Sequence, residues 1–573
     1  MDLNHPNLLA QDGTPVSETE PQFHQQMVYA VAMSVIAVFE RALGRTVQWS
    51  PDLRRDADGR VIPNPNGEFV RRLRIYPHAV RAANAYYDLR RKAVLFGYFP
   101  ARSKPGGRVL PNGTVFTCLS FDVIAHEMTH AVLDGLHRSF LAATNPDVLA
   151  FHEAFADVVA LFQHFSHPDV LRTQVAKVAG KLENEGMLGQ LAQQFGAAMG
   201  LHGSLRSYLG EKDEKGGWTP KTPDPSLLAR TTEVHDRGAI LVAAMFTAFQ
   251  TIYRKRTRDL MRIATQGSGL QPPGDLHPDL VGRLADEAAK TARHLLQMAI
   301  RALDYLPPVD LTFGEYLRAL ITADYDVVPA DGHLYRVALV DAFRQWGIYP
   351  QHVTNLSVDS LLWSPPETAT TKLDMDLFRE ILGIGNGTLK IDRGDMYQRQ
   401  REMQARVHEW LRGCFANDPA LAAEWGLDVS PTAPHSIDRD TRTPALPKFE
   451  VHSLRRCWRA GPDQPERIDL LVEVVQKRRG YFDPADQARA DAGTLGTDAV
   501  RGDFDFLGGV TLIVDPRAGR IRYAIRKAIR NDRDTRLEQV RRFVAGGGRA
   551  LGLRDNYFPG DGNPFPHLHV SDE

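Results

Sequence analysis

The chain has 573 residues, of which 43% are hydrophobic and 24% are charged, and its formal net charge is -1. A chain of this length exceeds a single hydrophobic core and indicates about two to four domains. Its charge balance excludes proteins that bind nucleic acid or anionic membranes through a large net charge. The chain has three cysteines, too few for a disulfide framework, which favours a reducing compartment such as the cytoplasm.

The chain begins with a polar segment, residues 1–20, that predicts a flexible tail. Residues 21–44 then predict a long helix that ends at a glycine. The longest apolar run of this helix, Met27 to Phe39, is too short to span a bilayer core of about 30 Å. Polar and acidic residues precede the run and no small-residue cleavage site follows it. We therefore interpret it as a buried helix rather than a signal peptide.

Strands are predicted next, at residues 73–77 and 83–99. The segment KAVLFGYF at 92–99 is typical of a buried strand. Residues 114–121 form another strand-like segment, in which Cys118 is expected to be a small buried apolar side chain. The N-terminal portion is therefore predicted to be a sheet capped by helices.

The segment DVIAHEMTHAVLDGLH, residues 122–137, contains an H-E-x-x-H motif. His126 and His130 are four residues apart and lie on one face of a helix, where two imidazoles can bind one zinc ion. Glu127 lies about 100° round the helix, where a general base beside the metal is needed. The other positions of this helix are mostly apolar, so the helix is expected to be buried. Buried histidines and a buried glutamate need partners, and a metal supplies one.

A second apolar helix is predicted at 149–165, after the turn signal Asn145-Pro146-Asp147. Glu153 and Asp157 are four residues apart on one face of it. The apolar surroundings favour a third metal ligand with a carboxylate behind it over a solvated acidic pair. His137 is the competing third ligand, but it stands one position out of register with the longer H-E-x-x-H-x-x-G-x-x-H pattern.

These motifs belong to a series of segments that resembles the thermolysin family of zinc metallopeptidases over about residues 21–350. The matching segments are residues 83–99, 119–134, 152–162, 204–207 and 233–240, together with helical segments at 298–320 and 335–348 that resemble the family's closing helices. The resemblance implies a two-lobed fold in which the H-E-x-x-H helix crosses the middle of the domain.

The resemblance also implies a role for each residue of the metal site. His126, His130 and Glu153 would bind one zinc ion per chain, with the fourth position left to water. Glu127 would activate this water as a general base and pass the proton to the leaving amine. Asp157 would orient a ligand histidine. Hydrolysis of peptide bonds is the reaction implied.

Further residues are matched to positions that contact the substrate. His235 would donate to the oxyanion of the tetrahedral intermediate, although a histidine just before a predicted helix is by itself typical of a cap or a surface residue. Arg206 would hold a substrate carbonyl. Asn84 and the backbone of Ala85 would bind the peptide beside an edge strand, where an extended chain can pair through its backbone.

The sequence departs from the family pattern near the catalytic residues. Thr144 stands where the family has a tyrosine that acts as a second oxyanion donor. Arg230 stands where the family has an aspartate that supports the catalytic histidine, so Glu233 or Asp236 is expected to support His235 instead. Both departures bear on how efficiently an amide would be hydrolysed.

A third departure concerns calcium. Asp122 matches a calcium-ligand position of the family, but His164 stands where a partner acid is expected. The resemblance therefore leaves calcium binding open.

The C-terminal part carries no catalytic motif. Residues 351–440 predict a connector of helices and loops, with a polar helix at 395–413. Residues 441–573 are β-rich and predict a small accessory domain, with a hairpin at 508–529. Residues 517–542 are rich in arginine, and a solvated basic face is favoured over a site for an acidic partner.

The sequence thus predicts an α+β protein. A two-lobed metallopeptidase domain at 21–350, with a mixed-sheet lobe and a helical lobe, precedes the connector and the accessory domain. The predicted function is a zinc-dependent endopeptidase acting on a peptide or protein substrate. The alternative is a weakly active or inactive scaffold of the same fold that binds a protein partner through its C-terminal domain. No nucleic acid or membrane partner is expected, the oligomeric state is left open, and the location is cytoplasmic or reached by non-classical export.

Overall fold

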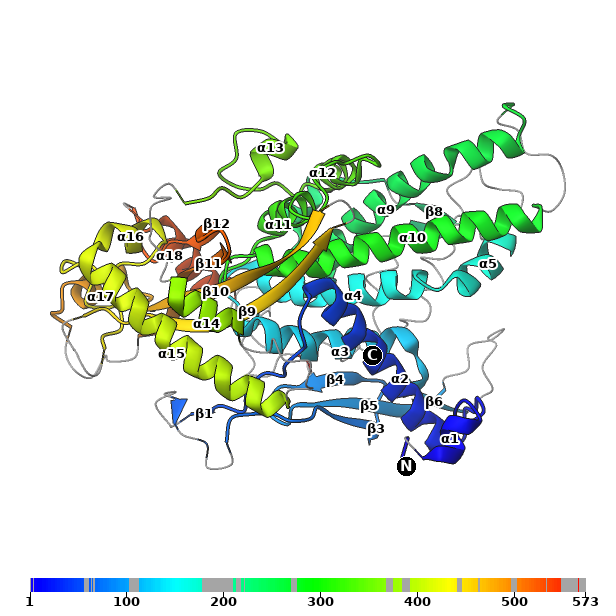
Figure 1. The fold of residues 1–573 in the computed structure, drawn as a ribbon, viewed down its shortest axis with the longest axis horizontal. Coiled ribbons are helices and arrows are strands. Elements are labelled where there is room, and N and C mark those ends of the chain that lie inside the picture. The colour runs from blue at the N-terminus through cyan, green and yellow to red at the C-terminus, as the bar shows by residue number, and fades with distance from the viewer. Residues whose placement is uncertain are drawn as a thin grey trace.

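The computed structural model shows a mixed α and β protein, with 52% helix and 17% strand, which confirms the predicted mixture. The residues described are 2–3, 5–55, 61–62, 64, 67–101, 113–177, 210–212, 218–220, 222–268, 276–366, 375–383, 392–440, 446–461, 464–495, 502–531, 533–547 and 565. Within them, two four-stranded sheets flank a group of long helices (Figure 1). Two short hairpins complete the strands: β1 (Arg54–Arg55) with β2 (Val61–Ile62), and β7 (Gly210–Lys212) with β8 (Trp218–Pro220).

The N-terminal sheet is mixed. Its strands are β3 (Arg74–Val80), β5 (Ala93–Pro100) and β4 (Ala85–Asp88) in that order, with β6 (Thr114–Phe116) also paired to β5. β3 and β5 are parallel, whereas β4 and β6 run antiparallel to β5. The predicted strand at 83–99 is two strands, because Asp88 accepts backbone hydrogen bonds from Arg90 and Arg91, at 2.9 and 2.8 Å, and turns the chain. β4 lies at an edge of the described sheet.

The N-terminal segment is more structured than the predicted tail. Helix α1 (Pro6–Ala10) forms there, with a proline in its first turn and His5 as its cap. The backbone amide of Thr14 then donates to the side chain of Gln26 at 2.8 Å, which fastens the segment to α2 (Pro21–Leu43). α2 itself packs against β3 and the central helices.

Two helices in the described part of the chain, α2 and α4 (Pro146–Phe165), are long and apolar enough to cross a membrane by length and composition alone. Inside the protein, 89% of the apolar window of α4 is buried, against 39% for α2. α4 is thus a core helix of this fold, and α2 buries one face that includes Val28, Val35 and Phe39.

The other helices of the region preceding residue 350 form a bundle beside the N-terminal sheet. They are α3 (Phe121–Leu136), α5 (Pro168–Lys177), α8 (Leu227–Arg230), α9 (Val234–Ala264), α10 (Pro278–Ala302), α11 (Phe313–Tyr325) and α12 (Tyr335–Gln345), with single turns η1 (Thr117–Leu119), η2 (Arg138–Leu141) and η3 (Leu303–Tyr305), and α13 (Val358–Leu361) follows them. Side-chain caps set where key helices begin: Ser120 caps α3, Asn145 caps α4 and Glu233 caps α9. α3 lies between the sheet and α4 (Figure 1).

The C-terminal sheet is antiparallel. Its strands are β9 (Glu450–Gly461), β10 (Gln464–Gly480), β11 (Phe504–Asp515) and β12 (Arg520–Lys527), in the order β12-β11-β10-β9. The predicted hairpin at 508–529 is confirmed, since Asp515 pairs with Arg520 across the turn. The carboxylate of Asp515 accepts the amides of Arg517 and Ala518, both at 3.0 Å, which shapes that turn.

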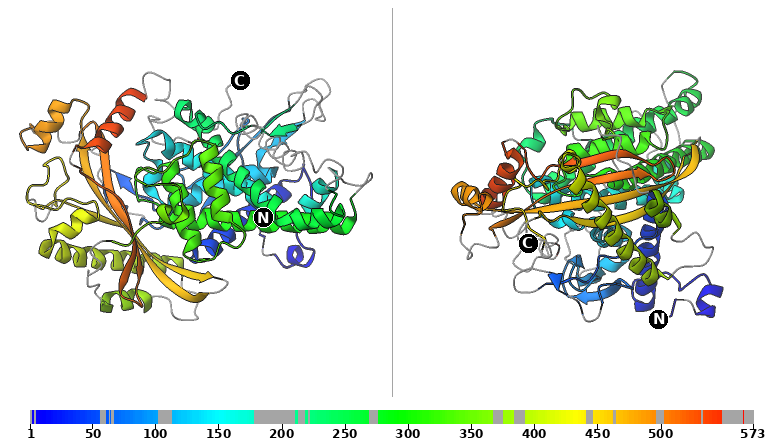
Figure 2. Two further views of the ribbon diagram at one scale, coloured as in Figure 1. Left: turned by 90° about the horizontal axis from the view of Figure 1, so that it is seen from above. Right: turned by 60° about the vertical axis from the view of Figure 1, so that its left-hand side comes forward.

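This sheet is packed on both faces. One face adds Cys457, Leu471, Ile513 and Ile525 to the core of the helical bundle. The other face carries the helices of the connector, which are α14 (Met375–Gly383), α15 (Arg393–Asn417) and α16 (Pro419–Glu424). The C-terminal region also contains α17 (Pro484–Asp491), α18 (Thr535–Arg542) and the π-turn η5 (Phe543–Gly547). Figure 2 shows the sheet between α15 and the bundle. The C-terminal region therefore shares a core with the rest of the protein.

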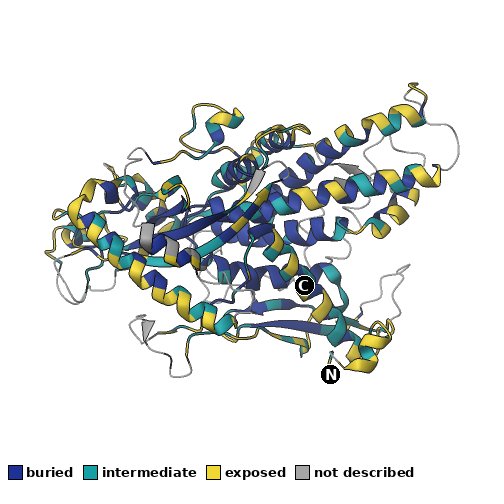
Figure 3. Cartoon of the chain, in the orientation of Figure 1, coloured by how far each residue is buried: buried dark blue, intermediate teal, exposed yellow. Residues whose placement is uncertain are grey.

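Buried acids attach the C-terminal sheet to the bundle. Asp304 in η3 accepts hydrogen bonds from Arg45, at 2.6 and 2.7 Å, and from Arg459 on β9 at 2.5 Å. Asp326, the cap at the end of α11, accepts from Arg467 and from Arg522 of β12. Asp304, Asp326 and Arg459 are buried, whereas Arg45, Arg467 and Arg522 are partly exposed. Figure 3 shows buried segments along the strands of the C-terminal sheet and along the helices of the bundle.

In the segment 517–542, which is predicted to be a solvated basic face, Arg517, Arg520, Arg526, Arg530, Arg533 and Arg542 are exposed as expected, whereas two other arginines bind acids of the protein itself. Arg522 is bound to Asp326, and Arg536 to Asp310 at 3.1 Å. These two arginines meet acids from distant segments of the same chain, which composition alone does not indicate.

β9 also approaches the end of α2 closely. Gly44 caps α2 with a left-handed φ of 65°, and its carbonyl accepts the amide of Trp458 at 3.0 Å. A Cβ at this position would lie 1.9 Å from the carbonyl oxygen of Trp458. Glycine is therefore required here both by the backbone angle and by the contact with β9.

Candidate metal centre

Three predicted ligands meet between α3 and α4. His126 and His130 project from α3 with their Nε2 atoms 2.9 Å apart. Glu153 of α4 places its carboxylate 3.4 Å from His126 Nε2 and 3.6 Å from His130 Nε2. The ligand atoms of all three residues lie within 4.8 Å of one another, and all three side chains are buried. The residues are thus positioned to hold a metal ion.

The hydrogen bonds behind the ligands fit a metal site. Nδ1 of His126 donates to Asp157 Oδ1 at 2.8 Å, because a carboxylate only accepts, and this leaves Nε2 as the coordinating nitrogen. Burial by itself lowers the pKa of His126, but the hydrogen bonds with Asp157 and Glu153 outweigh it and raise the pKa to about 10. The same acidic surroundings favour a metal cation at this point. Asp157 thus takes the orienting place that the sequence predicts.

Replacing Asp157 by asparagine should weaken metal binding by about 10- to 100-fold, because the amide orients His126 less firmly and removes a negative charge. Competition with a chelator measures the affinity. Asp169→Asn, at an exposed acid of α5, is the matched control and should leave the affinity unchanged. Equal affinities for the two variants would contradict the role of Asp157.

Glu127 follows the first ligand on α3 and is buried at 2% exposure. A buried carboxylate next to a candidate metal ligand is placed for proton transfer. His137, the competing third ligand, lies elsewhere: it caps α3 and pairs with Glu473 of β10 at 3.0 Å. The described structure therefore favours Glu153 over His137 as the ligand.

His235 lies in the first turn of α9 and faces the metal centre. Its Nε2 is 3.9 Å from the carboxylate of Glu153, and its Nδ1 is 3.1 Å from Glu233. Glu233, one of the two predicted supports, therefore holds the ring. Arg230 instead pairs with Asp224 in an exposed contact at 2.5 Å.

The start of α9 is fixed against α4. Arg237 donates to Asp147 of α4 at 2.6 Å. At Gly238 the helices approach so closely that a Cβ would lie 2.9 Å from the carbonyl of Ala150. Since His235 precedes these contacts by two and three residues, they set its position relative to Glu153.

The edge strand β4 is tied to α3. Tyr87 donates to Asp134 of α3 at 2.9 Å. Asn84 precedes the strand and its carbonyl accepts the amide of Gly97 at 2.8 Å, while Ala85 pairs with Phe96 of β5. Asn84 therefore directly precedes, and Ala85 begins, the strand that packs beside α3; their role in binding a peptide stays a prediction. Arg206 lies outside the described residues.

Phe565 covers one side of the centre, which the sequence analysis missed. Its ring stacks on His130, with centroids 4.3 Å apart and an interplanar angle of 30°, and is fully buried. It also lies 5.2 Å from His152 and 6.2 Å from Tyr87. An aromatic residue between two prolines near the C-terminus gives no local signal that it reaches α3.

At two of the places where the sequence departs from the thermolysin-like pattern, the side chains make contacts inside the protein. The hydroxyl of Thr144 donates to Asp310 at 2.8 Å and is committed to that buried acid rather than to an oxyanion. Asp122 pairs with His164 at 3.0 Å, so an imidazole fills the place of a second acid there.

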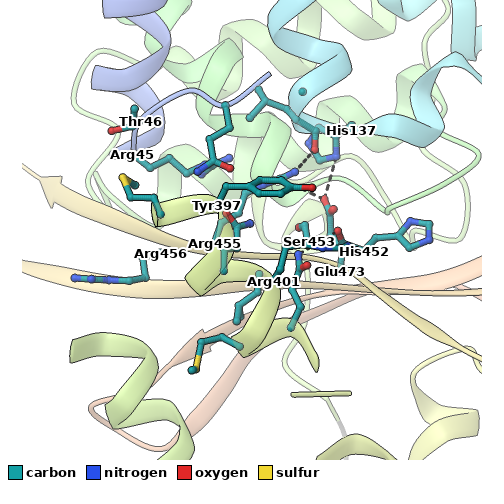
Figure 4. Close-up of a pocket in the computed structure, with 18 of the residues that line it drawn as sticks. Arg45, Thr46, His137, Tyr397, Arg401, His452, Ser453, Arg455, Arg456 and Glu473 are labelled. Atoms are coloured by element: carbon teal, nitrogen blue, oxygen red, sulfur yellow. Dashed lines mark hydrogen bonds and ion pairs between the residues drawn. The ribbon is translucent and has the colours of Figure 1, made fainter. Parts of the chain in front are cut away.

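One cavity lies apart from the metal centre. It has a volume of about 710 Å³ and lies where the end of α3 meets β9, β10 and α15. Figure 4 shows Tyr397, Arg455 and Glu473 around it, with His137 at one side. Arg455 donates to the carbonyl of Leu136, a favourable place for a cation at a helix C-terminus. The candidate ligands do not line this cavity, so its size says nothing about the metal chemistry.

No protein-family model matches the chain, and no curated protein matches its sequence. The arrangement of α3, α4 and α9 is therefore the main indication of what the protein does.

Proposed function

We propose that this protein is a zinc-dependent endopeptidase with a two-lobed, thermolysin-like architecture. The observation that carries the proposal is the buried group of His126, His130 and Glu153, held between α3 and α4. Two imidazoles and one carboxylate form a typical catalytic zinc set. Glu127 on α3 and His235 on α9 supply groups of the kinds that peptide hydrolysis needs beside such a metal.

Zinc held by these residues would lower the pKa of bound water to about 7 and polarise the scissile carbonyl. Glu127 accepts a proton and returns it to the leaving amine. Nδ1 of His235 donates to Glu233, so its Nε2 donates to an oxyanion only when the ring is protonated. An extended substrate pairs with β4 through its backbone.

The test is cleavage of a mixed peptide library by the purified full-length protein, before and after chelation and after return of zinc. We expect cleavage that is lost with the metal and restored by zinc. His130→Ala should bind one metal ion fewer per chain than the wild type and should cleave nothing. Cleavage that survives complete metal removal would contradict the proposal.

The second candidate is a scaffold that binds a protein partner and hydrolyses little or nothing. The commitment of Thr144 to Asp310 favours it, because this place offers no second oxyanion donor. Zinc bound at His130 without cleavage of any peptide would support the scaffold. A cytoplasmic location and a peptide or protein substrate stay predictions under either function.

A further inference from the structure

A second group of metal-ligating side chains lies beside the N-terminal sheet. His24 on α2, His78 on β3 and Cys118 in η1 place their ligand atoms within 4.8 Å of one another. We propose that these residues bind a second transition-metal ion, zinc, through two imidazole nitrogens and one thiolate. This site is separate from the proposed catalytic one and does not depend on it.

The hydrogen bonds of His24 prepare it as a ligand. Its Nε2 lies 3.0 Å from the carbonyl of Glu18, which only accepts, so Nε2 carries the proton and Nδ1 keeps its lone pair. Nδ1 is directed at Nε2 of His78, 2.8 Å away. A backbone carbonyl is a usual partner for the far nitrogen of a metal-bound histidine.

The same arrangement occurs at the catalytic cluster. There, Asp157 holds one nitrogen of His126, and the other nitrogen faces His130 at 2.9 Å. In both clusters, one ring nitrogen of a histidine is hydrogen-bonded to an oxygen atom, and its other ring nitrogen faces a nitrogen of a second imidazole. Among the described residues, these two clusters alone combine such a pair with a third ligand.

Cys118 supplies the third ligand and the negative charge. Its side chain is fully buried, and burial raises the pKa of the thiol to about 12, so the sulfur stays protonated at neutral pH without a metal. On binding, the S–H bond breaks, a sulfur–metal bond forms and one proton leaves to solvent. His78 is exposed, so its proton can move to the other ring nitrogen, and the ion can enter from that side.

The position of the site indicates a structural role. An ion there would join α2, β3 and the turn η1, which ends two residues before α3 begins. Phe116 closes the apolar side, with its ring centroid 4.6 Å from His24 and 5.2 Å from His78. Mixed nitrogen and sulfur ligands are typical of structural zinc.

Cobalt titration of the metal-free, full-length protein tests this site. We expect two cobalt ions per chain and a near-ultraviolet thiolate-to-cobalt charge-transfer band. The catalytic cluster holds only nitrogen and oxygen ligands and gives no such band. Cys118→Ser should remove the band and one cobalt ion per chain. His78→Ala, at an exposed residue where misfolding is not expected, should lower the affinity for that cobalt by at least about tenfold.

Two control variants distinguish this site from another thiol and from the catalytic cluster. Cys414→Ser, at a half-buried cysteine of α15, should keep the band and both ions. His126→Ala should lose the catalytic ion and keep the band, which makes the result independent of peptidase activity. A wild-type protein without the band at two equivalents of cobalt, or a band that persists in Cys118→Ser, would overturn the proposal.

Discussion

Replacing Glu127 by glutamine should reduce peptide cleavage by about 10²- to 10⁴-fold, the usual contribution of a positioned general base. Glutamine has nearly the same shape but accepts no proton at neutral pH. The residue is buried on α3 and follows His126, whose ligand nitrogen faces His130. Because Glu127 is not one of the clustered ligands, the variant should keep its full metal content.

The measurement compares cleavage rates and metal content of wild type and Glu127→Gln side by side. Glu409→Gln, at an exposed position of α15, is the control for the chemical change itself and should match the wild type in both. Full activity of Glu127→Gln would remove the general base from the mechanism. Loss of the metal together with activity would show that Glu127 acts as a ligand instead.

The metal cluster could be predicted from sequence because its geometry is local. Residues four apart on a helix share a face, so His126 and His130 had to point the same way once α3 formed. The helix start at Asn145 was readable for the same reason, since its side chain acts on an amide two residues away. The prediction that Glu153 is the third ligand also depends on the packing of α4 beside α3.

Contacts between distant segments could not be predicted in this way. The stacking of Phe565 on His130 and the grouping of His24, His78 and Cys118 join residues that share no local pattern. The C-terminal sheet is the largest such case. Its strands look like those of a small independent domain, because the alternation of side chains does not reveal which surface covers each face.

The C-terminal sheet contacts α3, the helix that carries His126 and His130, through polar side chains. Arg455 of β9 binds the last turn of α3, and Glu473 of β10 binds His137 directly after it. Arg536 of α18 binds Asp310, which also holds Thr144 just before α4. Both helices that carry metal ligands are therefore connected at one end to the C-terminal region. We therefore expect the C-terminal region to help hold α3 and α4 in place, and Asp304 offers a way to test this.

Replacing the buried carboxylate of Asp304, which binds Arg45 and Arg459, gives the sharpest test of this connection. Asp304→Asn should lower the free energy of unfolding by about 3–5 kcal/mol, because it removes the charge that pairs with the guanidinium groups of Arg45 and Arg459 inside the protein. Asp469, 3.9 Å from Arg459, replaces only part of that charge. Arg45 and Arg459 both bind this carboxylate, which has no exposed surface. Burial by itself raises the pKa of Asp304, but the two arginines outweigh it and hold the pKa far below its usual range. The carboxylate is therefore charged throughout the neutral range.

Urea unfolding followed by far-ultraviolet circular dichroism and by metal release measures the effect. Asp341→Asn, which removes an acid from an exposed pair with Arg344, should leave the urea midpoint unchanged. If the sheet and the bundle are one structural unit, Asp304→Asn should shift both signals together to lower urea. Unfolding in two steps, with metal release at its wild-type midpoint, would show that the sheet is an independent accessory domain. In that case the partner-binding role predicted for it from sequence would gain support.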